Sequence, residues 1–185
     1  MLGVGESLPE FSIVGVKPKF NAHEEKGVSA FETITNNSFP GKWKVFYFYP
    51  KDFTFVCPTE IVEFAKISKD FEDRDCVVLG GGTDNEFCKL AWRREHKDLS
   101  GLNQWSFADN GGVFASALGI LDRKAKVPLR ATFIVDPHNV IQHVSVNSLS
   151  VGRNPKETLR ILDALQTDDL CPCNRPVGGD VIKAA

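Results

Sequence analysis

Cysteine is the side chain in this sequence with the widest chemistry, and one of the five cysteines lies between an apolar strand and a long helix. Cys57 is followed directly by Pro58. Proline has no backbone N–H and is tolerated only in the first turn of a helix, so Cys57 must lie at, or within a couple of residues of, a helix start. The free N–H groups and the positive dipole end there favour the thiolate, which is the nucleophilic form. The sequence thus predicts a nucleophilic cysteine, against the alternative of a buried packing cysteine at a strand–helix junction.

Two residues just before Cys57 could serve the same chemistry. The Thr54 hydroxyl can donate a hydrogen bond to the sulfur or to a bound oxygen, and Pro50 can shield one side of the pocket from water. The segment from Pro50 to Glu60 is therefore the candidate site.

The other four cysteines are predicted to have different roles. Cys76 begins an apolar strand and Cys88 lies on a helix, so both are expected to be packing residues. Cys171 and Cys173 supply two thiolates with no histidine or further cysteine nearby, which is too few ligands for a structural zinc site. An odd number of cysteines, with no visible secretory signal, argues against a static disulfide scaffold.

Composition restricts the class of protein. The chain has 185 residues, 42% of them hydrophobic, and a formal net charge of −2, which favours one globular domain with a substantial core. Nothing in that balance indicates a nucleic-acid partner or an anionic membrane surface. The most apolar stretch, Val45 to Tyr49, is far too short to span a bilayer. We expect a soluble, cytoplasmic protein.

The elements around Cys57 alternate between strands and helices. Short strands and loops are expected over residues 9–35, followed by a buried strand at 44–49 and a helix whose inner face carries Ile61, Phe64, Ala65 and Phe71. A second buried strand is predicted at 76–80. The next helix, 85–97, is expected to bury Phe87, Leu90 and Ala91.

The carboxyl-terminal half continues the alternation. A short helix at 113–118 and a strand pair at 131–135 and 140–146 are predicted. Asn154, Pro155 and Glu157 predict the start of a last helix with a capping box. The whole pattern predicts an α/β fold with a mixed central sheet flanked by helices. Residues 1–167 are expected to form the domain, and residues 168–185 an extended, mobile tail.

Several motifs together resemble one protein family. Pro50, Thr54 and Cys57 have the spacing P-x-x-x-T-x-x-C, the signature of the peroxiredoxins. The wider string FYFYPKDFTFVCPTEIVEF resembles the typical two-cysteine class, especially the bacterial alkyl hydroperoxide reductase C type. The resemblance covers nearly the whole chain, and its further matches are Thr83–Phe87, Ala91-Trp92, Arg130–Asp136, Ser150–Asn154 and Cys171.

This resemblance implies a thioredoxin-like fold and a thiol-dependent peroxidase. In the implied mechanism, the Cys57 thiolate attacks hydrogen peroxide or an alkyl hydroperoxide and becomes a sulfenic acid. Arg130 matches the arginine that stabilises the thiolate and the developing charge, and Glu60 matches the acid that orients this arginine. Cys171 matches the resolving cysteine, which forms a disulfide with Cys57 of a partner subunit.

The same resemblance implies partners but no cofactor. Neither metal, haem nor flavin is expected. A homodimer is implied, often assembled into a ring of dimers. A dithiol reductant must restore the thiols, and a thioredoxin-like protein, a flavoprotein and a small dithiol protein remain open.

The tail departs from the common family pattern. Cys173 is an additional cysteine, and the pair Cys171-Pro-Cys173 resembles the actinobacterial branch. Cys173 could take over the disulfide from Cys171 or relay it to the reductant, or it could be a surface thiol without a role, and these alternatives stay open. Asn174-Arg175-Pro176 stands where an aromatic residue is usual, which leaves open how the tail docks. Two other functions on the same fold are a disulfide oxidoreductase, which expects a second cysteine where Glu60 stands, and a holdase chaperone.

Overall fold

A seven-stranded mixed sheet forms the centre of the molecule, whose computed structural model describes residues 1–183. Three central strands run parallel to one another, and the outer strands pair antiparallel. The spatial order is β4 (Phe31–Thr35), β1 (Ser12–Val16), β7 (Trp105–Ala108), β6 (Cys76–Gly82), β5 (Trp43–Phe48), β8 (Arg130–Val135) and β9 (Ile141–Asn147). A separate short hairpin joins β2 (Glu24–Glu25) to β3 (Val28–Ser29). The predicted mixed sheet is confirmed.

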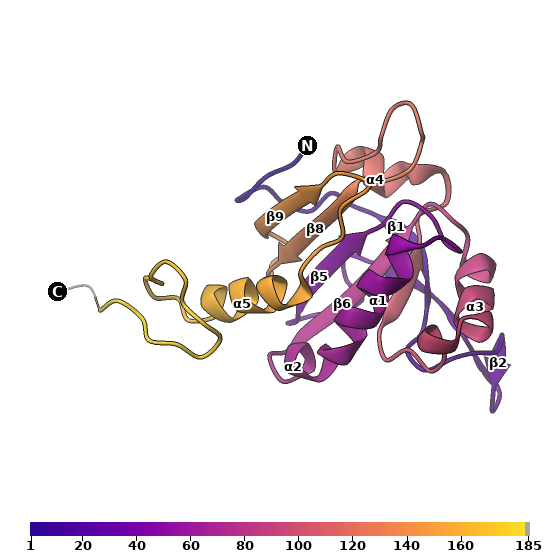
Figure 1. Cartoon of the computed structure of the whole chain (residues 1–185), viewed down its shortest axis with the longest axis horizontal. Coiled ribbons are helices and arrows are strands. Elements are labelled where there is room, and N and C mark those ends of the chain that lie inside the picture. Colours follow the sequence, from indigo (N-terminus) through magenta and orange to yellow (C-terminus); the bar gives the residue numbers. More distant parts are fainter. Residues whose placement is uncertain (184–185) are drawn as a thin grey trace.

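Helices cover both faces of this sheet (Figure 1). The larger group is α1 (Val56–Lys66), α2 (Ser68–Glu72), α3 (Glu86–Glu95) and α5 (Pro155–Leu165), while α4 (Val113–Ala117) lies on the opposite face. Two short 3₁₀ turns are formed by Lys97–Leu99 and Asn110–Gly112. No helix within residues 1–183 is both long enough and apolar enough to cross a membrane.

Strand β5 is buried on both faces, as its unbroken apolar sequence predicts. Phe46 and Phe48 pack into the cluster beneath α4, whereas Val45, Tyr47 and Tyr49, the residue after the strand, pack into the cluster beneath α1 and α5. Successive side chains of a strand point to opposite faces, which accounts for this alternation. The chain that leaves the end of β5 toward α1 therefore lies among buried side chains.

The predicted single helix carrying Ile61 and Phe71 is in fact two helices. Helix α1 ends at Lys66, and Ile67 takes a non-helical backbone conformation (φ −112°, ψ 18°) before α2 begins. Phe64 and Phe71 still pack in one buried cluster on either side of this break. The apolar spacing thus indicated the correct buried face, but a local change in backbone direction is invisible to that pattern.

The predicted inner face of α3 is partly wrong. Phe87 is about half exposed, whereas Lys89 and Arg93 are buried together with Leu90 and Trp92. Both charged side chains are accommodated because oxygen atoms surround them. Arg93 donates to the carbonyls of residues 16, 17 and 104 and to the hydroxyl of residue 106. A pattern that counts only apolar residues cannot identify buried charges of this kind.

Helix α5 begins where the sequence predicts, but without the capping box. Asn154 Oδ1 accepts a hydrogen bond from the Lys156 N–H, and Pro155 is in the first turn. Glu157 instead binds the Arg160 guanidinium with both carboxylate oxygens, at 2.7 Å each.

After α5 the chain becomes irregular and extends away from the sheet (Figure 1). The sequence predicts a mobile tail over residues 168–185, of which residues 184 and 185 lie outside the described part of the chain. The described part of the tail makes specific contacts with Asp163. These contacts attach the tail to the last helix.

Candidate active site

Cys57 is the second residue of α1, at the end of the loop that follows β5. Its side chain is completely buried. Phe55, the residue before the helix, provides no side-chain cap, and Pro58 has no N–H to offer. Because α1 begins at Val56, the predicted position of Cys57 in the first turn of a helix is confirmed.

Arg130 reaches Cys57 from the neighbouring strand. Because β5 and β8 are antiparallel, the end of β5 lies beside the start of β8, where Arg130 is the first residue. Its Nη1 atom lies 3.4 Å from Cys57 Sγ and 2.7 Å from Glu60 Oε2. Its Nε atom donates to the Leu149 carbonyl at 2.7 Å, which fixes the plane of the guanidinium. The structure thus brings together three of the predicted site residues.

Glu60 lies one turn after Cys57 on the same face of α1 and holds a second arginine. The Nε atom and the backbone N–H of Arg153 donate to Glu60 Oε1 at 2.8 and 3.0 Å. Arg153 Nη2 donates to Glu60 Oε2 at 2.8 Å, and Nη1 donates to the Ala131 carbonyl. The guanidinium also lies 5.3 Å from the centre of the Tyr47 ring, a cation–π distance.

Sequence reasoning gave Arg153 no role, although Arg153 belongs to one of the matching stretches. It lies 93 residues from Glu60 in the chain, so no local spacing connects the two. The only available signal is that a buried carboxylate needs more hydrogen-bond donors than one arginine supplies. All three charged side chains are at most 4% exposed. Together they carry one net positive charge, which a Cys57 thiolate would neutralise.

Comparison with known proteins agrees with this geometry. Residues 4–144 match the model of the AhpC/TSA family. Alkyl hydroperoxide reductase C of Mycolicibacterium smegmatis is 45% identical over 188 residues, which cover 100% of this chain and 95% of the relative. The chain is a peroxiredoxin. Peroxiredoxins are thiol-dependent peroxidases, so the predicted family and enzyme class are confirmed.

Solved structures give the same result for the fold of this peroxiredoxin. Mycobacterium tuberculosis AhpC superposes with a TM-score of 0.84 at 44% identity, covering 92% of this chain and 97% of that one. The reduced 2-Cys peroxiredoxin of Plasmodium vivax superposes with a TM-score of 0.87 at 31% identity, covering 99% and 94%. The predicted thioredoxin-like fold is therefore confirmed.

Thr54 and Pro50 lie in the loop that leads into α1, and both are half-buried. The Thr54 hydroxyl donates to the Lys51 carbonyl at 2.9 Å, within its own loop. This contact holds the turn, and the hydroxyl oxygen can still accept a hydrogen bond. The predicted roles of Thr54 at the sulfur and of Pro50 as a shield stay predictions.

The two tail cysteines lie beyond the end of α5, far along the chain from Cys57. Cys171 is half-buried, with Sγ 3.4 Å from Thr167 Oγ1 and 3.7 Å from the Ala164 carbonyl oxygen. Cys173 is exposed. All five cysteines are free thiols in this structure.

Cys76 is buried in the core, whereas Cys88 is half-buried on α3. Burial raises the pKa of the Cys76 thiol far above its ordinary value. Burial, followed by the charges of Asp52 and Asp84, raises the pKa of Cys88 to about 11. Both groups are therefore thiols at neutral pH, and thiols are poor nucleophiles.

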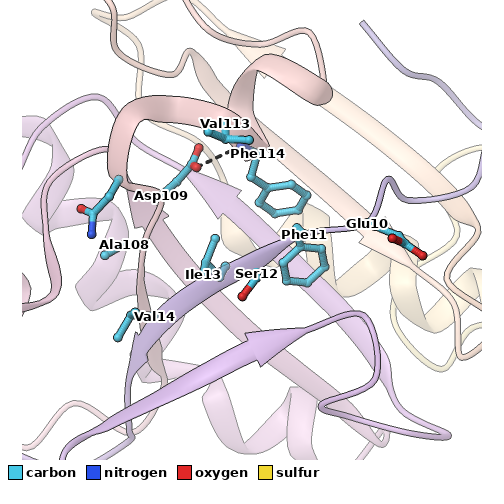
Figure 2. A pocket seen from close by; sticks show the side chains of 10 residues that line it. Glu10, Phe11, Ser12, Ile13, Val14, Ala108, Asp109, Val113 and Phe114 are labelled. Atoms are coloured by element: carbon cyan, nitrogen blue, oxygen red, sulfur yellow. Dashed lines mark hydrogen bonds between the residues drawn. The ribbon is translucent and has the colours of Figure 1, made fainter.

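A separate cavity of about 480 Å³ lies between β1, β7 and α4 (Figure 2). Its walls include Phe11, Ile13 and Phe114, together with the buried acid Asp109. Both oxygens of Asp109 accept backbone N–H groups at the start of α4, from Phe114 at 2.9 Å and Ala115 at 2.8 Å. This carboxylate is therefore committed to capping the helix. No group of three His, Cys, Asp or Glu side chains within residues 1–183 could hold a metal ion.

Proposed function

We propose that this peroxiredoxin reduces hydrogen peroxide and organic hydroperoxides, with Cys57 as the residue that attacks the peroxide. The observation that carries the proposal is the 3.4 Å contact between Arg130 Nη1 and Cys57 Sγ in a buried site. A guanidinium beside the sulfur provides positive charge where both the thiolate and the reacting oxygens need it.

The reaction is a displacement at oxygen. The thiolate of Cys57 attacks the terminal peroxide oxygen, an S–O bond forms, and the O–O bond breaks. The leaving oxygen takes a proton and departs as water or an alcohol, while Cys57 becomes a sulfenic acid. Arg130 lies where it can stabilise the negative charge that develops on the peroxide oxygens.

Glu60 and Arg153 support this step by orientation. Glu60 fixes Arg130 through one oxygen, and Arg153 holds the Glu60 carboxylate through three contacts. Such an arrangement is already in place before peroxide arrives, which is what electrostatic stabilisation requires. We assign Thr54 and Pro50 to the walls of the peroxide pocket.

The sulfenic acid is resolved by Cys171 in the tail, residues 168–185, of a second subunit. The Cys171 thiol attacks the Cys57 sulfur, a disulfide forms, and water leaves. Because Cys57 is completely buried, its loop must open before a second chain can reach the sulfur. The half-buried edge strand β9 offers a surface on which a homodimer can form, and such dimers can assemble into a ring.

A dithiol reductant completes the cycle by thiol–disulfide exchange. Exposed Cys173 lies two residues from Cys171, so it can accept the disulfide and pass it to the reductant. The oxidoreductase alternative is not favoured, since Glu60 stands where a second active-site cysteine would be needed and binds two arginines. A holdase activity stays a prediction.

The test is stoichiometric peroxide consumption by fully reduced protein, followed by non-reducing electrophoresis. Wild type should consume about one equivalent rapidly and become a disulfide-linked dimer. Cys57→Ser should consume none, Cys171→Ser should consume peroxide without forming that dimer, and Cys76→Ala should behave as wild type. If neither wild type nor Cys57→Ser consumed peroxide, the proposal would be overturned.

A further inference from the structure

A buried ion pair fastens the loop before Cys57 to α3. Asp52, in the middle of this loop, accepts hydrogen bonds from Lys89 Nζ at 3.1 and 3.3 Å. Both side chains are 1% exposed. Lys89 Nζ also lies 3.3 Å from the Tyr49 hydroxyl and 4.9 Å from the centre of the Tyr49 ring. The pair thus joins the end of β5, the loop and α3.

The same loop is held at two further points. The Asp52 N–H donates to Asp84 Oδ2 at 2.8 Å, just after β6. The next residue, Phe53, has a left-handed backbone (φ +53°), which is strained for a side chain of this size, and its ring lies 5.7 Å from that of Trp92. A strained residue persists only where its surroundings determine it, and here Asp52 provides the adjoining constraint.

Neither Asp52 nor Lys89 touches the sulfur, but the loop they hold leads directly to it. Thr54 follows Asp52 by two residues, and Cys57 follows by five. Opposite charges in a dry environment attract strongly, and their geometry is specific when each is hydrogen-bonded to the other. The ion pair therefore fixes the loop at its middle, between the end of β5 and the helix that carries Cys57.

We propose that Asp52 and Lys89 are positioning residues for the peroxide reaction, which hold the loop closed so that Thr54 and Cys57 form the pocket. This inference rests on the proposed function. It predicts two effects of opposite sign when the pair is removed. Peroxide should react more slowly because the pocket is less often formed, and Cys57 should become more accessible to reagents that need no pocket.

The experiment compares Lys89→Met and the double variant Asp52→Asn with Lys89→Met, both in the reduced full-length protein. The double variant keeps side-chain bulk and leaves no unpaired buried charge, so it decides the matter if Lys89→Met fails to fold. Arg74→Met is the matched control, because it breaks a different ion pair, Arg74–Asp163, away from this loop. Circular dichroism and thermal unfolding establish the folded fraction.

The two measured rates are sulfenic acid formation with hydrogen peroxide and labelling of Cys57 by N-ethylmaleimide, located by peptide mass spectrometry. Removing the pair should slow the first about tenfold or more, since small misplacements are costly in catalysis, and should accelerate the second. Arg74→Met should leave both within about twofold of wild type. Wild-type rates in the double variant, slower peroxide reaction without faster labelling, or equal changes in Arg74→Met would overturn the proposal. If the wild-type protein did not react with peroxide, the proposed function would fail. The rate at which N-ethylmaleimide labels Cys57 would still test whether the Asp52–Lys89 ion pair holds the loop closed.

Discussion

Glu60 and Asp163 each bind two arginines, but only Glu60 does so out of contact with water. Glu60, Arg130 and Arg153 are at most 4% exposed, whereas Asp163 is 13% exposed, and its two partners differ, with Arg74 24% exposed and Arg175 4% exposed. Glu60 joins the two arginines beside Cys57. Asp163 holds the tail, because Arg175 Nη1 and the Gly178 N–H both donate to its Oδ2, at 2.6 and 2.9 Å.

The difference indicates what each cysteine needs. Under the proposed function, Cys57 needs a fixed electrostatic environment, which burial strengthens. In the same proposal, Cys171 must be held in the tail and then released, and the Arg175–Asp163 contact, whose side chains are 4% and 13% exposed, provides that hold. The tail docks through Arg175, in the region where an aromatic residue is usual. Arg175 is almost completely buried and binds Asp163. Its Nε atom is buried without a partner among residues 1–183, which weakens this attachment.

The largest expected effect is on the peroxide reaction when Arg130 is replaced. Arg130→Met removes the donor beside Cys57, and the rate of sulfenic acid formation should fall about 10²- to 10³-fold. Stopped-flow measurement with limiting peroxide gives this rate. Arg175→Met, which loses an arginine from the tail, should react at nearly the wild-type rate. A fall of less than about threefold in Arg130→Met would show that the guanidinium does not act on the reacting atoms.

The second effect concerns stability. Glu60→Gln leaves two buried arginines without their carboxylate and should lower the free energy of unfolding by about 3 kcal/mol. Asp163→Asn acts at a partly exposed site and should cost about 1 kcal/mol or less. Urea denaturation of the two variants measures both values. Equal losses would contradict the contrast between the dry and the hydrated carboxylate.

A smaller effect is expected at the tail. Arg175→Met should detach residues around Cys171 and raise the rate at which iodoacetamide alkylates its thiol, by about fivefold for a lost contact of about 1 kcal/mol. Arg74→Met is the control, because it removes the other partner of Asp163 without touching the tail. Unchanged alkylation in Arg175→Met would mean that the Asp163 contact does not hold Cys171.

The smallest effect is the response of the tail to acid. Burial alone would raise the pKa of Asp163, but hydrogen bonds from Gly178, Arg175 and Arg74 outweigh it and lower this pKa below its usual value. Stabilisation by this carboxylate is therefore complete above the ordinary aspartate pKa of about 3.9 and is lost as the pH falls through the lowered value. Hydrogen exchange at the Gly178 N–H should lose protection there. If the Gly178 N–H stayed equally protected from exchange down to about pH 2, the Asp163 carboxylate would not be what holds this part of the tail.

The sequence predicted the sheet and the first-turn position of Cys57 because both depend on local patterns. Proline after cysteine fixes the helix start, and an unbroken apolar run identifies β5. Arg130 and Glu60 were predicted as site residues from the resemblance to the peroxiredoxin family. The sequence could not reveal several of the buried charges, among them Lys89, Arg93 and Arg153. Each is buried because partners far away in the chain satisfy it, and no spacing rule encodes such distant pairs.

The most direct test of the account identifies the sulfur that peroxide oxidises. Protein carrying Cys171→Ser and Cys173→Ser is reduced, treated with one equivalent of hydrogen peroxide and trapped with dimedone, which reacts with sulfenic acids. Peptide mass spectrometry then locates the adduct. The account predicts the adduct at Cys57, and its loss when Arg130→Met is added under the same brief exposure. An adduct at Cys76 or Cys88, with Cys57 unmodified, would contradict it.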